Sequence, residues 1–248
     1  MQRAALRQVL VVYAVVAAVT AVVTRLHAVP LLADNAHLVV AALFLLGAVR
    51  YAHREEHGME RFGIDLAGVL SPPPDDAPVG WRGKLGLLSD LVRALPSAGR
   101  ELAVALAVAA IVFPPFAVGY WLWYGPTHPF TFRLPDDPAS YALAQIVVVA
   151  LPEEAFFRGF VQTRLGDAFP RTRRLLGADV SLVAIVGQAA LFALVHFVVD
   201  LSPARLAVFF PGLLFGWLRA RRGGIGAGIW MHALSNVWSA TLQASWLS

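Results

Sequence analysis

The segment VVVALPEEAFFRGF, residues 147–160, decides how this chain folds and what it does. Glu153 and Glu154 lie side by side in an otherwise apolar run, and Arg158 follows one helical turn after Glu154. Residues four apart share a helix face, so Glu154 and Arg158 can pair, whereas Glu153 is rotated by about 100°. The spacing therefore predicts one paired carboxylate and one carboxylate that is available for chemistry.

The composition is that of a membrane protein. Of the 248 residues, 58% are hydrophobic and 15% are charged, and the mean hydropathy is +0.65. Soluble domains are about 45–50% apolar and about 25% charged. The chain has no cysteine, which excludes disulfides, thiolate metal sites and cysteine nucleophiles. The basic residues lie between apolar segments, so we expect a lipid bilayer as partner and no nucleic acid.

Apolar runs of about 20 residues predict seven membrane spans, with eight as the alternative count. The runs cover residues 9–24, 31–49, 101–124, 139–160, 179–199, 203–218 and 224–247. The predicted fold class is all-α, a polytopic transmembrane helical bundle with catalytic groups in its core. We expect two regions: N-terminal transmembrane helices with a cytoplasmic loop over 1–100, and a catalytic transmembrane core over 101–248.

Lysine and arginine in alternate connections predict the orientation, with the N-terminus cytoplasmic and the C-terminus outside. The predicted outer connections hold only Arg25, Arg133 and Arg205. The alanine- and arginine-rich composition favours a bacterial inner membrane. The polar segment 50–100 is predicted to be a cytoplasmic loop, which either carries an amphipathic helix around 85–95 on the membrane surface or is a poorly ordered linker.

Two further spans carry polar groups: His196 lies in LFALVHF, and His232 and Asn236 lie one turn apart in WMHALSNVW. An ionisable side chain within a span costs about 2.5–3.5 kcal/mol on insertion, so each is a candidate functional residue. Complementary groups on three spans predict an active site in the bundle core. A structural ion pair, packed histidines, or a transporter that uses Glu153 as proton carrier are the alternatives.

These motifs resemble those of the CPBP family of intramembrane proteases, which includes the type II CAAX prenyl endopeptidases and the Abi proteins. The family pattern is EExxxR, FxxxH and HxxxN. The chain has EEAFFR at 153–158, FALVH at 192–196 and HALSN at 232–236, in that order and on separate predicted spans. The resemblance covers about residues 139–246.

The resemblance implies a role for each motif residue. Glu153, assisted by His196, would activate a water for attack on a peptide carbonyl, and His232 and Asn236 would stabilise the oxyanion. Glu154 and Arg158 are supporting residues that would hold the fourth span in register, although Glu154 could share the role of base.

Two questions stay open at the level of sequence. The family is often described as metalloproteases, and Glu153, His196 and His232 would be the ligands of a zinc ion; because no HExxH is present, we favour a reaction without a cofactor. The expected substrate is a membrane-anchored protein. Its cleavage serves C-terminal processing or sorting, as in a myxosortase-like branch, or removes a prenylated CAAX peptide, and a non-catalytic immunity or scaffold protein is the third alternative.

The depth of His196 is the critical expectation. At about 1.5 Å per residue, His196 falls nearer the outer end of its span than Glu153 does. We therefore expect the turn DLSPAR, residues 200–205, to be embedded in the membrane as a short hairpin. A separation of more than about 10 Å between His196 and Glu153 would exclude a shared site.

Overall fold

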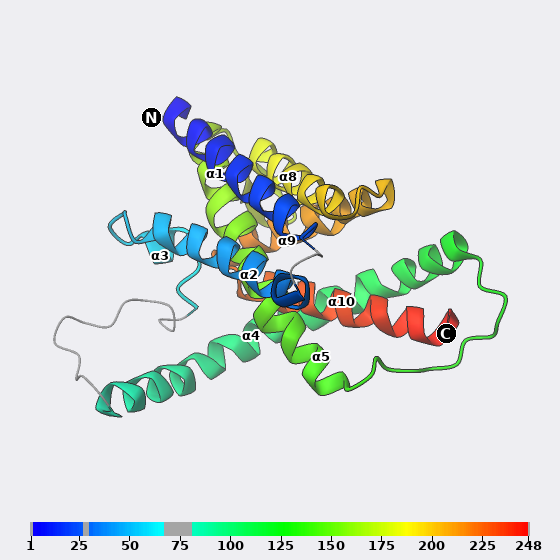
Figure 1. Cartoon of the computed structure of the whole chain (residues 1–248). Helices are drawn as coiled ribbons and strands as arrows, with labels where there is room; N and C mark the ends of the chain where they lie inside the picture. Colours follow the sequence, from blue (N-terminus) through cyan, green and yellow to red (C-terminus); the bar gives the residue numbers. More distant parts are fainter. Residues whose placement is uncertain (1, 27–29, 67–80, 248) are drawn as a thin grey trace.

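A computed structural model describes residues 2–26, 30–66 and 81–247 (Figure 1). Within these ranges the regular structure is helical except for a short antiparallel hairpin, and non-helical connections such as residues 125–137 join the elements, which confirms the all-α class. The principal helices are α1 (Gln2–Val23), α2 (Pro30–Ala52), α3 (Gly58–Arg61), α4 (Trp81–Tyr124), α8 (Leu182–Asp200), α9 (Phe209–Arg222) and α10 (Gly226–Trp246). The fourth predicted span is the continuous helical stretch α5 (Pro138–Ala144), η1 (Gln145–Ala150), α6 (Leu151–Glu154), η2 (Ala155–Val161) and α7 (Gln162–Ala168).

Five stretches of the described chain are long and apolar enough to cross a membrane. They are Gln2–Val23, Asn35–Ala52, Leu88–Tyr124, Pro138–Ala168 and Leu182–Asp200. Large apolar side chains point outward from them, for example Ile111, which is 74% exposed. A bundle surrounded by lipid requires such a surface, so the polytopic architecture is confirmed.

The remaining two predicted spans need correction in detail. The run 203–218 is not one helix: η3 (Pro203–Val208) is a 3₁₀ helix, and α9 starts only at Phe209. Its 14 residues extend about 21 Å, less than the bilayer core of about 30 Å. The α10 helix has 21 residues and is long enough to cross a membrane, but its polar side chains make it less apolar than the five stretches named above. The fifth span begins at Leu182 rather than residue 179, because β1 (Arg173–Leu175) and β2 (Ala178–Val180) form the hairpin that precedes it.

The segment predicted as a surface helix around 85–95 belongs to a much longer element. The α4 helix has 44 residues and is therefore about 66 Å long, roughly twice the bilayer core. Its first turns extend away from the other helices (Figure 1) and expose Leu88, Val92 and Leu95. Because α4 is continuous through residue 100, the division into regions 1–100 and 101–248 stays a prediction.

The helix that carries the glutamates is widened on both sides of them. Pro152 has no N–H to donate to the carbonyl four residues earlier, and its ring would clash with that carbonyl. The preceding η1 accordingly has π-helical geometry, and the N–H of Leu151 bonds to the carbonyl of Ile146, five residues back. The following η2 is also π-helical. Such widened turns occur frequently at functional sites.

Aromatic packing fixes this helix in the centre of the bundle. Phe156, Phe157 and Phe160 are fully buried, and Phe44 of α2 stacks on Phe156 with ring centroids 5.2 Å apart. The α1 helix closes the other side, where the hydroxyl of Tyr13 donates to the carbonyl of Leu191 in α8 over 2.9 Å. The predicted catalytic core is thus packed directly against the N-terminal helices.

One end of the bundle is held by a network of charges. Glu55 accepts hydrogen bonds from Arg61 and Arg164, and Arg61 also contacts Asp167 at 2.5 Å. Burial alone would raise the pKa of the Glu55 carboxyl, but the bonds and positive charges of Arg164 and Arg61 outweigh burial and lower this pKa. The network ties the segment after α2 to α3 and to α7.

We predict that Glu55→Gln lowers the free energy of unfolding by about 1.5–3 kcal/mol, the usual worth of hydrogen bonds to charged groups. Because the pKa of Glu55 is lowered in the folded state, its contribution is complete above the ordinary value of 4.5 and disappears as the pH falls through the native value. Thermal unfolding in detergent at pH 7 and below pH 4.5 measures both effects. Glu56→Gln is the matched control, since the Glu56 side chain is 93% exposed, and equal stabilities of the two variants would contradict the prediction.

Candidate active site

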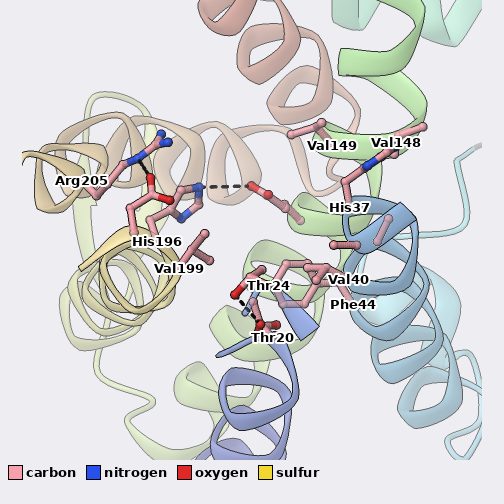
Figure 2. Close-up of a pocket in the computed structure, with 14 residues that line it drawn as sticks. Thr20, Thr24, His37, Val40, Phe44, Val148, Val149, His196, Val199 and Arg205 are labelled. Atoms are coloured by element: carbon pink, nitrogen blue, oxygen red, sulfur yellow. Dashed lines mark hydrogen bonds and ion pairs between the residues drawn. The ribbon is translucent and has the colours of Figure 1, made fainter. Parts of the chain in front are cut away.

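Glu153 lies between the two predicted histidines. Its Oε2 atom is 3.7 Å from Nε2 of His232 and 4.0 Å from Nε2 of His196. The three side chains come from α6, α10 and α8, which are distant in sequence. Glu153 and His196 are therefore well within the limit of about 10 Å. Both residues line one cavity, and Figure 2 shows His196 in its wall.

In each imidazole, the hydrogen bond of Nδ1 determines whether Nε2 carries a hydrogen or a lone pair. Nδ1 of His196 lies 2.9 Å from the carbonyl of Phe192, and Nδ1 of His232 lies 3.0 Å from Oε1 of Glu154. A carbonyl and a carboxylate only accept, so each Nδ1 carries the hydrogen and donates it. In the neutral form each Nε2 then directs a lone pair toward Glu153, so the site gathers three acceptor atoms.

Glu154 has the supporting position that the sequence predicts. Its carboxylate is fully buried and lies 2.9 Å from Nη1 of Arg158, which is also fully buried. The Arg158 guanidinium lies over the rings of Phe192 and Phe215, 4.3 and 5.0 Å from their centroids. Favourable cation–π contacts therefore replace part of the hydration that this charge loses. Glu154 joins Arg158 and His232 through the same oxygen, so one carboxylate connects η2 to α10.

The charges of these groups do not cancel. Two ionised carboxylates, Glu153 and Glu154, face one guanidinium, Arg158, so the cluster carries one excess negative charge. An uncompensated charge in a buried site is costly.

A glycine creates the space for Glu154. A Cβ atom at Gly228 would lie 2.7 Å from Oε2 of Glu154. Real Cβ atoms essentially never come so close, so only glycine lets α10 approach the carboxylate. Gly216 packs against Gln188, and Gly223 makes a turn at φ +78°.

Asn236 is oriented by a residue to which the sequence assigned no role. Asn236 lies one helical turn along α10 from His232, and its Nδ2 donates to Oε1 of Gln145 over 2.7 Å. Gln145 is the first residue of the π-helical η1. The bond thus connects α10 to the widened turn, and the contribution of Asn236 to an oxyanion site stays a prediction.

A cavity of about 400 Å³ opens beside Glu153 and His196. Figure 2 shows His196 and Arg205 on one side and Val40 and Phe44 on the other. His37 lies in α2 and lines this cavity. Of the fourteen residues that line the cavity, seven are apolar and seven are polar or charged; cavities that bind a substrate likewise combine apolar walls with polar groups.

Sequence reasoning missed Phe215 and left Phe192 without a role. Phe192 contacts both imidazoles and Arg158, and Phe215 stacks on His232 at 5.0 Å. The position of Phe192 within the FxxxH pattern is a signal for it. Phe215 has no such signal, because only the packing of α9 brings its ring to the site.

The donor set does not match a preformed zinc site. Ligand atoms of tetrahedral zinc lie about 3.4 Å apart at bond lengths near 2.1 Å, whereas Oε2 of Glu153 is 3.7 and 4.0 Å from the imidazole nitrogens of His232 and His196. Across residues 2–26, 30–66 and 81–247, no three His, Asp or Glu side chains form a group suited to a metal ion.

Fold and site together define a polytopic helical membrane protein with a glutamate and two histidines in its core. Residues 135–238 match the family model described as type II CAAX prenyl endopeptidase Rce1-like. This region is therefore similar to the Rce1-like type II CAAX prenyl endopeptidases, as the three motifs predict. No curated protein and no solved structure matches the chain. The match indicates a protease of membrane-associated proteins.

We predict that Gly228→Ala displaces the Glu154 carboxylate and with it His232, and reduces proteolysis at least tenfold while the protein still folds. The reason is the 2.7 Å approach of the added Cβ to Oε2. Initial rates with purified protein in detergent measure the effect. Gly166→Ala in α7 is the matched control, because its Cβ would meet nothing within 4 Å; an unimpaired Gly228→Ala would show that the position of Glu154 is unimportant.

Proposed function

We propose that the protein is a glutamate-dependent intramembrane endopeptidase that hydrolyses a peptide bond of a membrane-anchored protein. The observation that carries the proposal is the convergence of His196 and His232 on the single oxygen Oε2 of Glu153, 4.0 and 3.7 Å away. The family match over residues 135–238 supports the same class of reaction.

Glu153 is the general base. The gaps of 3.7 and 4.0 Å are too long for direct hydrogen bonds, but they suit a water molecule that donates to the carboxylate and to an imidazole Nε2. As this water attacks the scissile carbonyl carbon, its proton passes to Glu153 and a C–O bond forms. When the tetrahedral intermediate collapses, the C–N bond breaks and Glu153 returns the proton to the leaving amine.

His232 and Asn236 are the candidates for stabilising the oxyanion. A protonated His232 keeps its Nδ1–H on Glu154 and directs an Nε2–H toward the reacting carbonyl. Its positive charge would also balance the excess negative charge of the two glutamates. The amide of Asn236 can join it by exchanging its bond to Gln145 for one to the oxyanion; removal of one such donor typically costs 10²–10³-fold in rate, to order of magnitude.

The finer assignment follows from composition and charge. We propose a bacterial inner membrane protein with a cytoplasmic N-terminus, because the arginine-rich connections fall at one end of the bundle. The substrate class is a membrane-anchored protein whose C-terminal region is processed or sorted. The walls of the cavity, which include Val40, Phe44, Val148, Val149 and Val199, suit an extended apolar segment.

The two adjacent glutamates should respond differently to loss of their charge. We predict that Glu153→Gln abolishes proteolysis and leaves thermal stability unchanged or higher, because it removes the excess negative charge. Glu154→Gln should lower the free energy of unfolding by about 3–5 kcal/mol, since it leaves the buried Arg158 unpaired. Thermal unfolding combined with cleavage of endogenous membrane proteins tests both; a folded Glu153→Gln protein that processes all substrates normally would refute the protease.

We also predict that proteolysis does not depend on zinc. Elemental analysis of the purified protein should give well below one zinc per chain, and the chelator 1,10-phenanthroline should leave the rate within twofold of the untreated enzyme. The opposite result would be one zinc per chain that the chelator removes together with the activity, with both restored by added Zn²⁺. That result would establish Glu153, His196 and His232 as metal ligands.

A further inference from the structure

The catalytic cavity is built from the same end of each helix that lines it. Thr20 lies in the last turn of α1, Thr24 follows directly after the helix, and Ala36 lies in the first part of α2. Val199 closes α8, and Arg205 lies in η3 immediately beyond it. The cavity therefore lies at the end of the bundle where α1 and α8 end and α2 begins.

The arginine-rich connections meet at the other end of these helices. Arg219 donates to the carbonyl of Arg61 over 3.0 Å, and Arg222 pairs with Glu101 at 2.6 Å. Arg221 donates to the carbonyl of Gly177 in the β1–β2 hairpin over 3.0 Å. These contacts join α3, α4, the hairpin and the α9–α10 turn. Figure 1 shows α3 and the first turns of α4 on the side opposite the C-terminus.

Buried side chains separate Glu153 from the arginine-rich end, where a second cavity of about 520 Å³ is lined by neither Glu153, His196 nor His232. Phe156, Phe157, Arg158 and Phe160, which follow Glu153 toward the arginine-rich end, are all fully buried. At the mouth of the catalytic cavity, by contrast, Arg205 pairs with Asp200, and their side chains are 53% and 37% exposed. A partly exposed ion pair marks a boundary with water or lipid headgroups. Water and substrate therefore have a route to Glu153 from the mouth.

The distribution of positive charge gives this route a direction. The chain has 20 lysines and arginines, and only Arg25, Arg133 and Arg205 fall in connections at the end that carries the mouth. Cytoplasmic loops hold the excess of lysine and arginine in membrane proteins. We propose that the catalytic cavity is filled from the non-cytoplasmic side, so that the substrate is a protein segment exposed on that face and not a cytoplasmic prenylated tail.

The identification of the occupant as a substrate rests on the proposed function, but the direction from which the cavity is reached does not. It names a substrate class different from the one in the family's description: membrane-anchored proteins whose cleavable segment has already crossed the membrane. An apolar segment would lie along the valines of the cavity, and its polar flank would meet Asp200 and Arg205 at the mouth.

The absence of cysteine from the sequence makes the test clean. Leu201, beside the mouth, and Leu176, in the hairpin turn, are both exposed leucines, at 62% and 77%, and both have a left-handed backbone, with φ of 52° and 47°. Leu201→Cys and Leu176→Cys are therefore matched. In intact bacterial cells a membrane-impermeant maleimide should label Leu201→Cys, and it should label Leu176→Cys only after permeabilisation.

Any other labelling pattern overturns the inference, and the result does not require activity. Ala204→Cys and Leu175→Cys replace either variant that fails to accumulate in the membrane. A second experiment addresses the cavity itself: Thr24→Cys, treated from outside with the impermeant reagent, should lose at least tenfold in proteolysis, whereas treated Leu201→Cys should retain it. If Thr24→Cys is fully labelled and its proteolysis is unaffected, the substrate enters elsewhere. The protease assignment itself is tested separately, by the activity of Glu153→Gln.

Discussion

The structure depends on one buried ion pair, that between Glu154 and Arg158. Both side chains are inaccessible, and the transfer of two charges from water to such an interior is costly unless the geometry is good and further partners are present. The protein supplies these partners from three helices: His232 from α10, Phe192 from α8 and Phe215 from α9. The need to satisfy this pair therefore sets how those helices pack around the π-helical segment.

This packing accounts for the position of the second glutamate. With Glu154 held by Arg158 and His232, the neighbouring Glu153 points the other way, into a cavity, where two imidazoles face it. Each imidazole has its Nδ1 engaged, by the carbonyl of Phe192 or by Glu154. The buried ion pair of Glu154 and Arg158 thus orients the cluster of Glu153 and the two histidines. The two adjacent glutamates therefore have separate roles.

The same division of tasks extends along the bundle. At the arginine-rich end, ion pairs and the aromatic core separate Glu153 from the second cavity, whereas the cavity that Glu153 lines has a charged mouth at the opposite end. A hydrolase in a membrane needs a protected carboxylate together with water, and this arrangement provides both.

The sequence by itself determined the all-α membrane class, the pairing of Glu154 with Arg158 and the identity of the motif residues, because apolar runs and i, i+4 spacing are local properties of a helix. It did not determine the break of the sixth span into η3 and α9, the continuity of α4 through residue 100, or the bond of Asn236 to Gln145. Nor could it show that Phe215 covers His232 or that His37 lines the cavity. Those features arise from contacts between segments far apart in the chain, where helix packing decides which side chains meet.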